Sequence, residues 1–207
     1  MTNEEKAQGL VTALKRKGYT AHYADTKSEA RELALSLIPA GAEVGFGGSV
    51  TTRELGLVEC LLQKGHTVFD HWQPGLSPEQ IMEIRRKQVI SDVFLTSANA
   101  VTAAGEIVNI DGLGNRVAGA IFGPKCVIVI VGVNKIAQDI DKALERSHSV
   151  AAINNARRLN LPTPCSKTGE CIDCNSPQRI CNISVIQHRR PAIAEYHVIV
   201  VGEEIGY

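Results

Sequence analysis

Apolar positions recur at helical spacing through the first half of the chain, and these segments alternate with short apolar runs. The predicted helices cover residues 3–17, 26–38, 50–63 and 78–88. The predicted strands cover residues 20–23, 43–46, 66–70 and 92–96. Strands that alternate with helices of this length favour an α/β fold, in which a mostly parallel open sheet is flanked by helices.

The second half of the chain has a different pattern. Three apolar runs at 105–110, 117–121 and 125–131 are separated by glycine-containing turns and predict strands or hairpins. Helical spacing returns at 139–159, and a final strand is expected at 197–201. A length of 207 residues suits one α/β domain. We therefore predict a single domain over 1–207 with a cysteine-rich loop segment at 163–181.

Charge and hydropathy narrow the class of partner. Lys and Arg together number 22, and so do Asp and Glu, so the concentrated positive charge that nucleic acids attract is missing. The longest apolar run, 127–133, is far shorter than the roughly 20 residues that span a bilayer. Residues 1–18 contain no apolar stretch of signal-peptide length. The sequence predicts a soluble, cytoplasmic protein with no membrane span, whose partners are small molecules or proteins and not nucleic acid.

A glycine turn lies between the strand expected at 43–46 and the helix that follows it. Gly47 and Gly48 would let an anion approach the backbone closely, and Ser49 and Thr51 add hydroxyl donors. The turn is neither a Walker A loop nor a dinucleotide-binding fingerprint. It predicts a phosphate or carboxylate site, and a purely structural turn explains the same residues equally well.

A polar cluster at 109–116 separates two apolar runs of the second half. Asp111 and Asn115 could orient a ligand, and Arg116 could bind a carboxylate or phosphate with both arms of its guanidinium group. The Asp-Gly and Gly-Asn pairs of this segment also suit a plain turn. The residues by themselves favour the plain turn.

Four cysteines near the C-terminal end carry the strongest chemical signal. They are Cys165, Cys171, Cys174 and Cys181. Thiols in a reducing compartment stay unpaired or bind metals, and four of them so close together predict coordination of one metal centre. Their spacing matches neither the bacterial ferredoxin run nor the paired zinc-ribbon motif. An iron-sulfur cluster of the [4Fe-4S] type is favoured, while zinc and redox-active or structural thiols remain open.

The other cysteines and the histidines show no metal-binding pattern. Cys60 lies in a predicted helix and Cys126 begins a predicted strand, so both are expected to be small buried hydrophobic residues. The six histidines lack the mutual spacing of metal ligands. His71, beside Trp72, is more typical of loop packing than of ligand binding.

Three segments carry a family resemblance. The sequences TSANAVTAAGEIVNIDGLGNR at 96–116, IFGPK at 121–125 and VGVNKI at 131–136 resemble the LUD-domain (lactate-utilisation) family, which includes the lactate-utilisation proteins B and C. The resemblance covers essentially the whole chain. It implies a link to bacterial lactate oxidation and a fold similar to those of ribose-5-phosphate isomerase, glucosamine-6-phosphate deaminase and the CoA transferases. By analogy with those relatives, one wall of an anion pocket would be residues 47–49, and the other Asn99, Asp111, Asn115 and Arg116.

The four-cysteine motif is not expected in every LUD domain, so the chain resembles a subgroup that carries it. Together, the resemblance and the motif predict a redox-associated protein of lactate or organic-acid utilisation, which binds a small anionic metabolite and exchanges electrons with redox protein partners. Two other classes remain open. One is a non-redox enzyme of the isomerase or CoA-transferase type with structural zinc, and the other is a non-catalytic metabolite-binding or assembly protein. A homodimer would suit this fold class.

Overall fold

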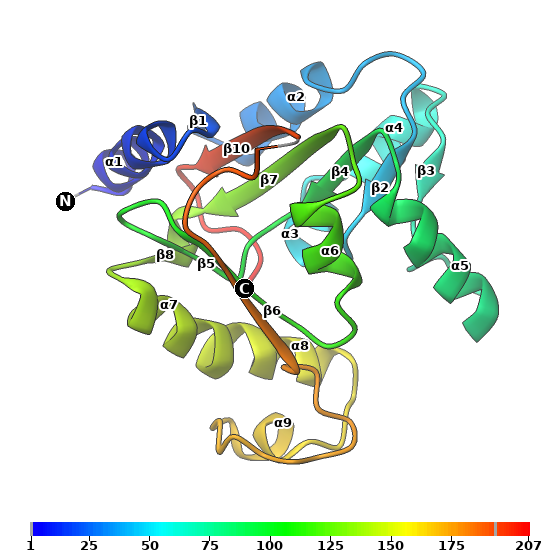
Figure 1. Ribbon diagram of the computed structural model, residues 1–207, viewed down its shortest axis with the longest axis vertical. Helices are drawn as coiled ribbons and strands as arrows, with labels where there is room; N and C mark the ends of the chain where they lie inside the picture. Colours follow the sequence, from blue (N-terminus) through cyan, green and yellow to red (C-terminus); the bar gives the residue numbers. More distant parts are fainter. Residues whose placement is uncertain (1, 193) are drawn as a thin grey trace.

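A six-stranded parallel sheet forms the centre of the computed structural model, which describes residues 2–192 and 194–207 (Figure 1). The strands lie in the order β1-β10-β7-β4-β2-β3, and every neighbouring pair is parallel. Their bounds are β1 (Thr20–Ala24), β2 (Val44–Phe46), β3 (Val68–Phe69), β4 (Val93–Thr96), β7 (Cys126–Gly132) and β10 (Glu195–Val201). The predicted α/β fold with a mostly parallel sheet is confirmed.

Helices cover both faces of this sheet. Those of the first half are α1 (Asn3–Arg16), α2 (Lys27–Ser36), α3 (Val50–Glu54), α4 (Leu57–Gln63) and α5 (Pro78–Val89). The central strand β7 shows how the two faces are filled, because successive side chains of a strand point to opposite sides. Ile128 and Ile130 pack with residues of α2 and α4, whereas Val127 and Val129 pack with residues of α1. Burial on both faces explains why this strand reads as an unbroken apolar run.

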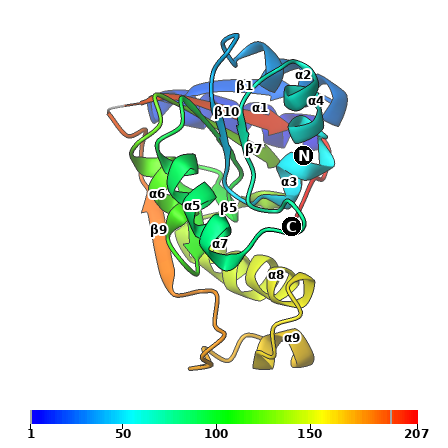
Figure 2. The same ribbon diagram turned by 90° about the vertical axis from the view of Figure 1, so that its right-hand side faces the viewer.

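A second sheet of four strands lies beside the first. Its order is β8-β5-β6-β9, with bounds β5 (Ala100–Thr102), β6 (Ile107–Asp111), β8 (Ile136–Ala137) and β9 (Ile183–Gln187). Val101 and Ile107 face the core beneath α1, while Ala100 and Val108 pack against α7 (Ile140–Arg146) on the other side. In both views α9 (Pro164–Thr168) lies at the end of the molecule away from the six-stranded sheet (Figures 1 and 2).

The strand predicted at 117–121 is wrong, because this segment is the helix α6 (Asn115–Ile121). A short apolar run does not distinguish a strand from a buried helix. The Asp111 carboxylate decides the outcome, since it accepts hydrogen bonds from the backbone N–H groups of Leu113, Gly114 and Val117 as the helix begins. Gly119 then brings α6 so close to Phe94 of β4 that a Cβ atom there would lie 2.7 Å from that ring.

Two predicted helices are interrupted. The segment 50–63 divides into α3 and α4 at Gly56, whose φ of 63° is left-handed. The segment 139–159 consists of α7, a π-helical stretch over Ser147–Ala152 and α8 (Ile153–Arg158). A 3-10 turn over Val133–Lys135 follows β7. Within the described residues, no helix is both long and apolar enough to cross a membrane.

Candidate ligand-binding site

The loops after β2 and β4 meet at the carboxyl-terminal edge of the six-stranded sheet, where open α/β sheets commonly bind ligands. The backbone N–H of Gly47 donates to the carbonyl of Leu95, which fixes the first loop against β4. A Cβ atom on Gly47 would lie 2.9 Å from Thr96 Oγ1 and 3.1 Å from Arg116 Cγ. Only glycine therefore fits at position 47, where the glycine turn packs against Thr96 and Arg116.

Two adjoining pockets open at this edge. The first, here called the lysine pocket, is lined by Gly48, Ser49, Val50, Thr51, Ser97, Ala98, Asn99, Ile110, Arg116, Lys135, Ala151, Ala152, Asn155, Ile180 and Tyr207. The second, here called the tryptophan pocket, is lined by Gly47, Gly48, His71, Trp72, Arg85, Ile110, Asp111, Gly112, Leu113, Asn115, Arg116, Asn155, Arg158, Leu159 and Ile180. All eight residues predicted to bind a ligand line one pocket or both, so the structure brings them together, and their binding of a ligand stays a prediction.

Lys135 is the residue of this site that the sequence analysis missed. It follows β7 in the 3-10 turn, is 2% exposed, and lines the lysine pocket. Its ammonium group donates to Thr51 Oγ1 at 2.8 Å, to Ser97 Oγ at 2.9 Å and to the carbonyl of Ala98 at 3.3 Å. A lysine directly after a buried apolar strand was the available signal, because such a position carries the side chain into the interior.

The charge around Lys135 is positive. Burial, followed by the positive charges of Arg146 and Arg116, lowers the pKa of Lys135 to about 7, although the negative charge of Glu54 opposes this shift. Arg146 donates to the backbone carbonyls of Asn134 and Asn99. Among the described residues, no carboxylate lies within ion-pair distance of Lys135 or Arg146. An anion in the lysine pocket would gain electrostatic stabilisation from Lys135 and Arg116, which both line it.

Arg116 joins the two polar loops. Its guanidinium group donates to Asn109 Oδ1 at 2.5 Å, to Asn99 Oδ1 at 2.9 Å, and to the carbonyls of Ile110 and Ser97 at 2.6 and 3.3 Å. Its Nε also lies 3.8 Å from Asp111 Oδ2. Most of its N–H groups thus donate to oxygen atoms of the protein itself. Arg116 therefore holds the wall between the two pockets in place and also contributes a positive charge to both pockets.

Other predicted residues are likewise engaged in local structure. Ser49 caps α3 by accepting from the backbone N–H of Thr52. Asn99 Oδ1 accepts from the backbone N–H of Ile110. Asn115 is half-buried at the wall of the tryptophan pocket, where α6 begins.

The tryptophan pocket is rich in guanidinium groups. Arg158 stacks over the Trp72 ring at 4.2 Å, and Arg53 approaches the same ring at 4.9 Å while pairing with Asp70. The Nε of Arg85 is buried and has no hydrogen-bond partner among the described residues. This lining suits an anion larger than a single carboxylate.

His71 is held beside Trp72 as a neutral ring. Gln88 Nε2 lies 2.8 Å from its Nδ1, and burial together with the charge of Arg85 lowers its pKa to about 4. Its edge contact with the Trp72 ring agrees with the packing role expected from the sequence, and the same ring also lines the tryptophan pocket.

The cysteine-rich loop reaches the same pockets. Ile180, next to Cys181, lines both of them, and the backbone N–H of Asn182 donates to the carbonyl of Asp111 at 3.0 Å. The side chain of Asn182 donates to the carbonyl of Gly112 as well. Two residues of the polar loop thus hold the end of the cysteine segment against the pocket wall.

Arg179 organises the cysteine segment itself. Its guanidinium group donates to the carbonyls of Cys174 at 2.7 Å and of Cys181 at 3.2 Å, and it pairs with Asp173 at 2.8 Å. The pKa of the Cys181 thiol is raised, mainly by burial and also by Cys171 and Cys174, although Arg179 lowers it in part. Three of the four cysteines are thus close enough to influence one another.

The four sulfur atoms do not close into a compact tetrahedron. All four cysteines are described, and no three of their sulfurs lie within 4.8 Å of one another. A tetrahedral zinc ion with bonds of about 2.3 Å would hold its sulfurs about 3.8 Å apart. The observed spacing is wider than such an ion requires.

Comparison with known proteins identifies the family. The model of the LUD domain family matches residues 7–201. The chain belongs to the LUD-domain family. A crystal structure of a DUF162 family protein from Deinococcus radiodurans resembles this LUD domain with a TM-score of 0.53 and 14% sequence identity, over 97% of this chain and 99% of that chain. An identity this low shows the shared fold alone.

None of the curated proteins compared with this LUD domain matches it. The family suggests a role in the utilisation of lactate or other organic acids.

Proposed function

We propose that this LUD domain binds a small organic acid of the lactate type in the lysine pocket. Lys135 carries the proposal. It is a buried amine at the pocket wall whose hydrogen-bond partners are all neutral, so within the described residues its protonated form has no carboxylate in direct contact. An isolated buried charge is costly, and a ligand carboxylate would supply the missing negative charge.

The neighbours of Lys135 suit such a ligand. Thr51 and Ser97 accept hydrogen bonds from the ammonium group. The Thr51 hydroxyl still has its own proton to donate, whereas Ser97 donates its proton to the Ala98 carbonyl. Asn155 adds an amide to the lining of the pocket. A carboxylate and a neighbouring hydroxyl or keto oxygen would therefore find both a cation and neutral donors.

We assign the four cysteines of the loop as the ligands of an iron-sulfur cluster. They are Cys165, Cys171, Cys174 and Cys181. Arg179 supports this assignment, because it holds the backbone carbonyls of Cys174 and Cys181 around one guanidinium group. Such a cluster would supply one-electron transfer.

The position of the loop supports a functional link between cluster and ligand. Ile180 lines both pockets beside Cys181, and Asn182 is bonded to the polar loop of the pocket wall. A redox centre here would lie next to a bound organic acid and close to the exposed Cys171, where a redox protein partner has access. The proposed role is a redox-associated subunit of organic-acid oxidation.

The cluster is tested by anaerobic purification, a visible spectrum, and analysis of iron, sulfide and zinc. We expect a brown protein that contains iron and sulfide. Replacement of Cys174 by Ser should abolish the visible absorption, whereas replacement of Cys60, which lies in α4, should leave it unchanged. A colourless protein with stoichiometric zinc would refute the electron-transfer part and leave the lysine pocket untouched.

The pocket is tested by calorimetric titration with lactate and with pyruvate. The variant Lys135→Met keeps the length of the side chain and removes its charge, and it should weaken binding at least about tenfold, because a hydrogen bond to a charged group contributes about 1.5–3 kcal/mol. The matched control is Lys125→Met, since Lys125 is exposed and paired with Asp92. Equal affinity in both variants would remove the lysine pocket from the proposal.

The guanidinium groups of the tryptophan pocket favour a second candidate. Arg85, Arg116 and Arg158 line one cavity, which would suit a phosphate group of a sugar phosphate or of CoA. This LUD domain would then be a non-redox enzyme of the isomerase or CoA-transferase type, with zinc in the cysteine loop. Binding of inorganic phosphate that is lost in Arg85→Ala, together with zinc and no iron, would favour this candidate.

A further inference from the structure

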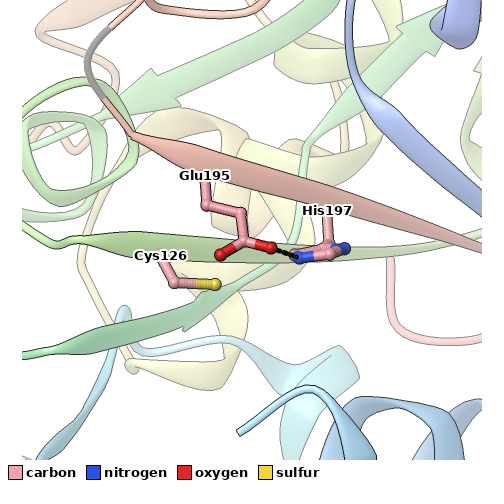
Figure 3. A group of neighbouring side chains, drawn as sticks. All are labelled: Cys126, Glu195 and His197. Carbon is pink, nitrogen blue, oxygen red and sulfur yellow. Dashed lines mark hydrogen bonds and ion pairs between the residues drawn. The ribbon is translucent and has the colours of Figure 1, made fainter. Parts of the chain in front are cut away.

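Three metal-binding side chains that lie far apart in the sequence meet at the opposite edge of the six-stranded sheet. Cys126 begins β7 and Glu195 begins β10, and the two residues are direct partners in the parallel ladder. His197 follows two residues after Glu195, so its side chain lies on the same face of β10. One ligand atom from each residue lies within 4.8 Å of the other two (Figure 3).

This cluster is separate from the pockets and from the cysteine-rich loop. All strands of the sheet are parallel, and these residues stand at the start of β7 and β10, whereas the lysine pocket lies where the strands end. None of the three residues lines either pocket. A ligand here would not compete with the organic acid or with the cysteine motif.

The donor set is that of a zinc ion. A thiolate sulfur, an imidazole nitrogen and a carboxylate oxygen are the three kinds of atom that zinc binds in proteins. Ionised Cys126 and Glu195 would together balance the two positive charges of the ion. Lys125 does not oppose it directly, because its ammonium group pairs with Asp92 at 2.8 Å.

Burial leaves one side of the cluster open. Cys126 and His197 are 8% and 6% exposed, whereas the side chain of Glu195 is 67% exposed. An ion held by these three atoms would keep one position directed to solvent, which is the arrangement of zinc sites with a bound water molecule.

A second histidine orients the ring of His197. Its Nδ1 lies 3.1 Å from His22 Nε2, and its Nε2 lies 2.9 Å from Glu195 Oε1. Burial and the nearby His197 lower the pKa of His22, so His22 is neutral and able to accept a hydrogen bond. With Nδ1–H donating to His22, Nε2 presents its lone pair towards Cys126 and Glu195, and such an outer partner is typical of metal-bound histidines.

We propose that Cys126, Glu195 and His197 form a zinc-binding site at the amino-terminal edge of the sheet, with His22 as the outer hydrogen-bond partner. In the metal-free protein the same atoms form a hydrogen-bonded chain in which His22 donates to His197 and His197 donates to Glu195. Binding of the ion releases the thiol proton of Cys126 to solvent. Each histidine keeps one proton, which moves from Nε2 to Nδ1 by exchange with its neighbour or with solvent, and no electron is transferred.

The test is titration with Co²⁺ and Zn²⁺ in a variant whose loop cysteines no longer compete. That variant replaces with serine all four residues of the loop motif, Cys165, Cys171, Cys174 and Cys181. We expect one Co²⁺ ion per chain, with the near-ultraviolet absorption of a single cobalt-thiolate bond, displaced by Zn²⁺. Cys126→Ser in this background should abolish the band, and Glu195→Gln should weaken Co²⁺ binding by about tenfold or more.

The matched control is Cys60→Ser, which removes the other cysteine outside the loop and should leave the cobalt spectrum unchanged. Absence of Co²⁺ binding in the four-serine variant, or a spectrum that survives Cys126→Ser, would overturn the proposal. If the four-serine variant does not fold, metal analysis of the full chain decides: Glu195→Gln should lose one zinc per chain relative to the unaltered protein, and an equal content would overturn the site.

Discussion

Removal of the Arg116 guanidinium group should destabilise this LUD domain more strongly than removal of an exposed arginine. The side chain is only 16% exposed and makes four hydrogen bonds to oxygen atoms of the surrounding loops. Three of these four acceptors keep another donor. Asn99 Oδ1 also accepts from the Ile110 N–H, Asn109 Oδ1 from the Asn99 N–H, and the Ser97 carbonyl from the Thr96 hydroxyl. The carbonyls of Ile110 and Ser97 lose the hydrogen bonds that Arg116 donates, and Asp111 loses a nearby charge.

The magnitude follows from these losses. A buried acceptor that loses its partner costs about 1–3 kcal/mol, and the loss of one member of a buried charged network costs about 3–5 kcal/mol. We therefore expect Arg116→Ala to lower the free energy of unfolding by about 3–5 kcal/mol. Arg116→Lys should recover only part of this loss, because an ammonium group cannot reproduce the two arms of the guanidinium group.

Urea denaturation followed by circular dichroism measures the effect, with the slope against urea concentration checked for constancy. Arg86→Ala is the control, since Arg86 is exposed and its ion pair with Glu83 spans 3.7 Å, so the expected loss is below about 0.5 kcal/mol. A loss below about 1 kcal/mol in Arg116→Ala would refute the view that Arg116 holds the loops together. Unfolding is measured without ligand, so the result is independent of any anion that Arg116 binds.

Three further outcomes are expected. Because Lys135 has a pKa of about 7, lactate affinity should be constant below pH 7 and fall above it by up to about tenfold per pH unit, and in Lys135→Met calorimetry should show no such fall. Gly123→Ala should lower the free energy of unfolding by about 3 kcal/mol or more in urea denaturation, because its Cβ atom would lie 2.0 Å from the Val89 carbonyl oxygen. The control Gly65→Ala also has a positive φ but lies in open space, so it should lower the free energy of unfolding by only about 1–2 kcal/mol. Arg179→Ala should speed proteolytic cleavage of the loop at 163–181, because it frees two loop carbonyls, and an unchanged cleavage rate would contradict its organising role.

The sequence determined most of the main sheet and the location of the candidate site. Hydrophobic periodicity predicted α1, α2, α5 and the parallel strands, because each apolar stripe reports which face of one element is buried. The glycine turn and the polar cluster were recognised as neighbours of a pocket from their residue types and from the family resemblance, and the structure brings both to the edge where β2 and β4 end.

Long-range contacts decided the rest. The segment 117–121 is a helix partly because the Asp111 carboxylate accepts hydrogen bonds at its start, which is a local signal that the strand prediction overlooked. The close packing of Gly119 against Phe94 is long-range and leaves no such signal. Lys135 acquires its unusual environment only when the turn after β7 meets Thr51 and Ser97, which lie 84 and 38 residues away in the sequence. The same holds for Cys126, expected to be a small buried residue, which meets Glu195 and His197 only because β7 and β10 pair in parallel. Hydrophobic periodicity in the sequence shows which side chains of one helix or strand are buried. The electrostatic surroundings, the pKa and the metal-binding partners of a side chain depend instead on which helices and strands become neighbours, and only tertiary packing determines those neighbours.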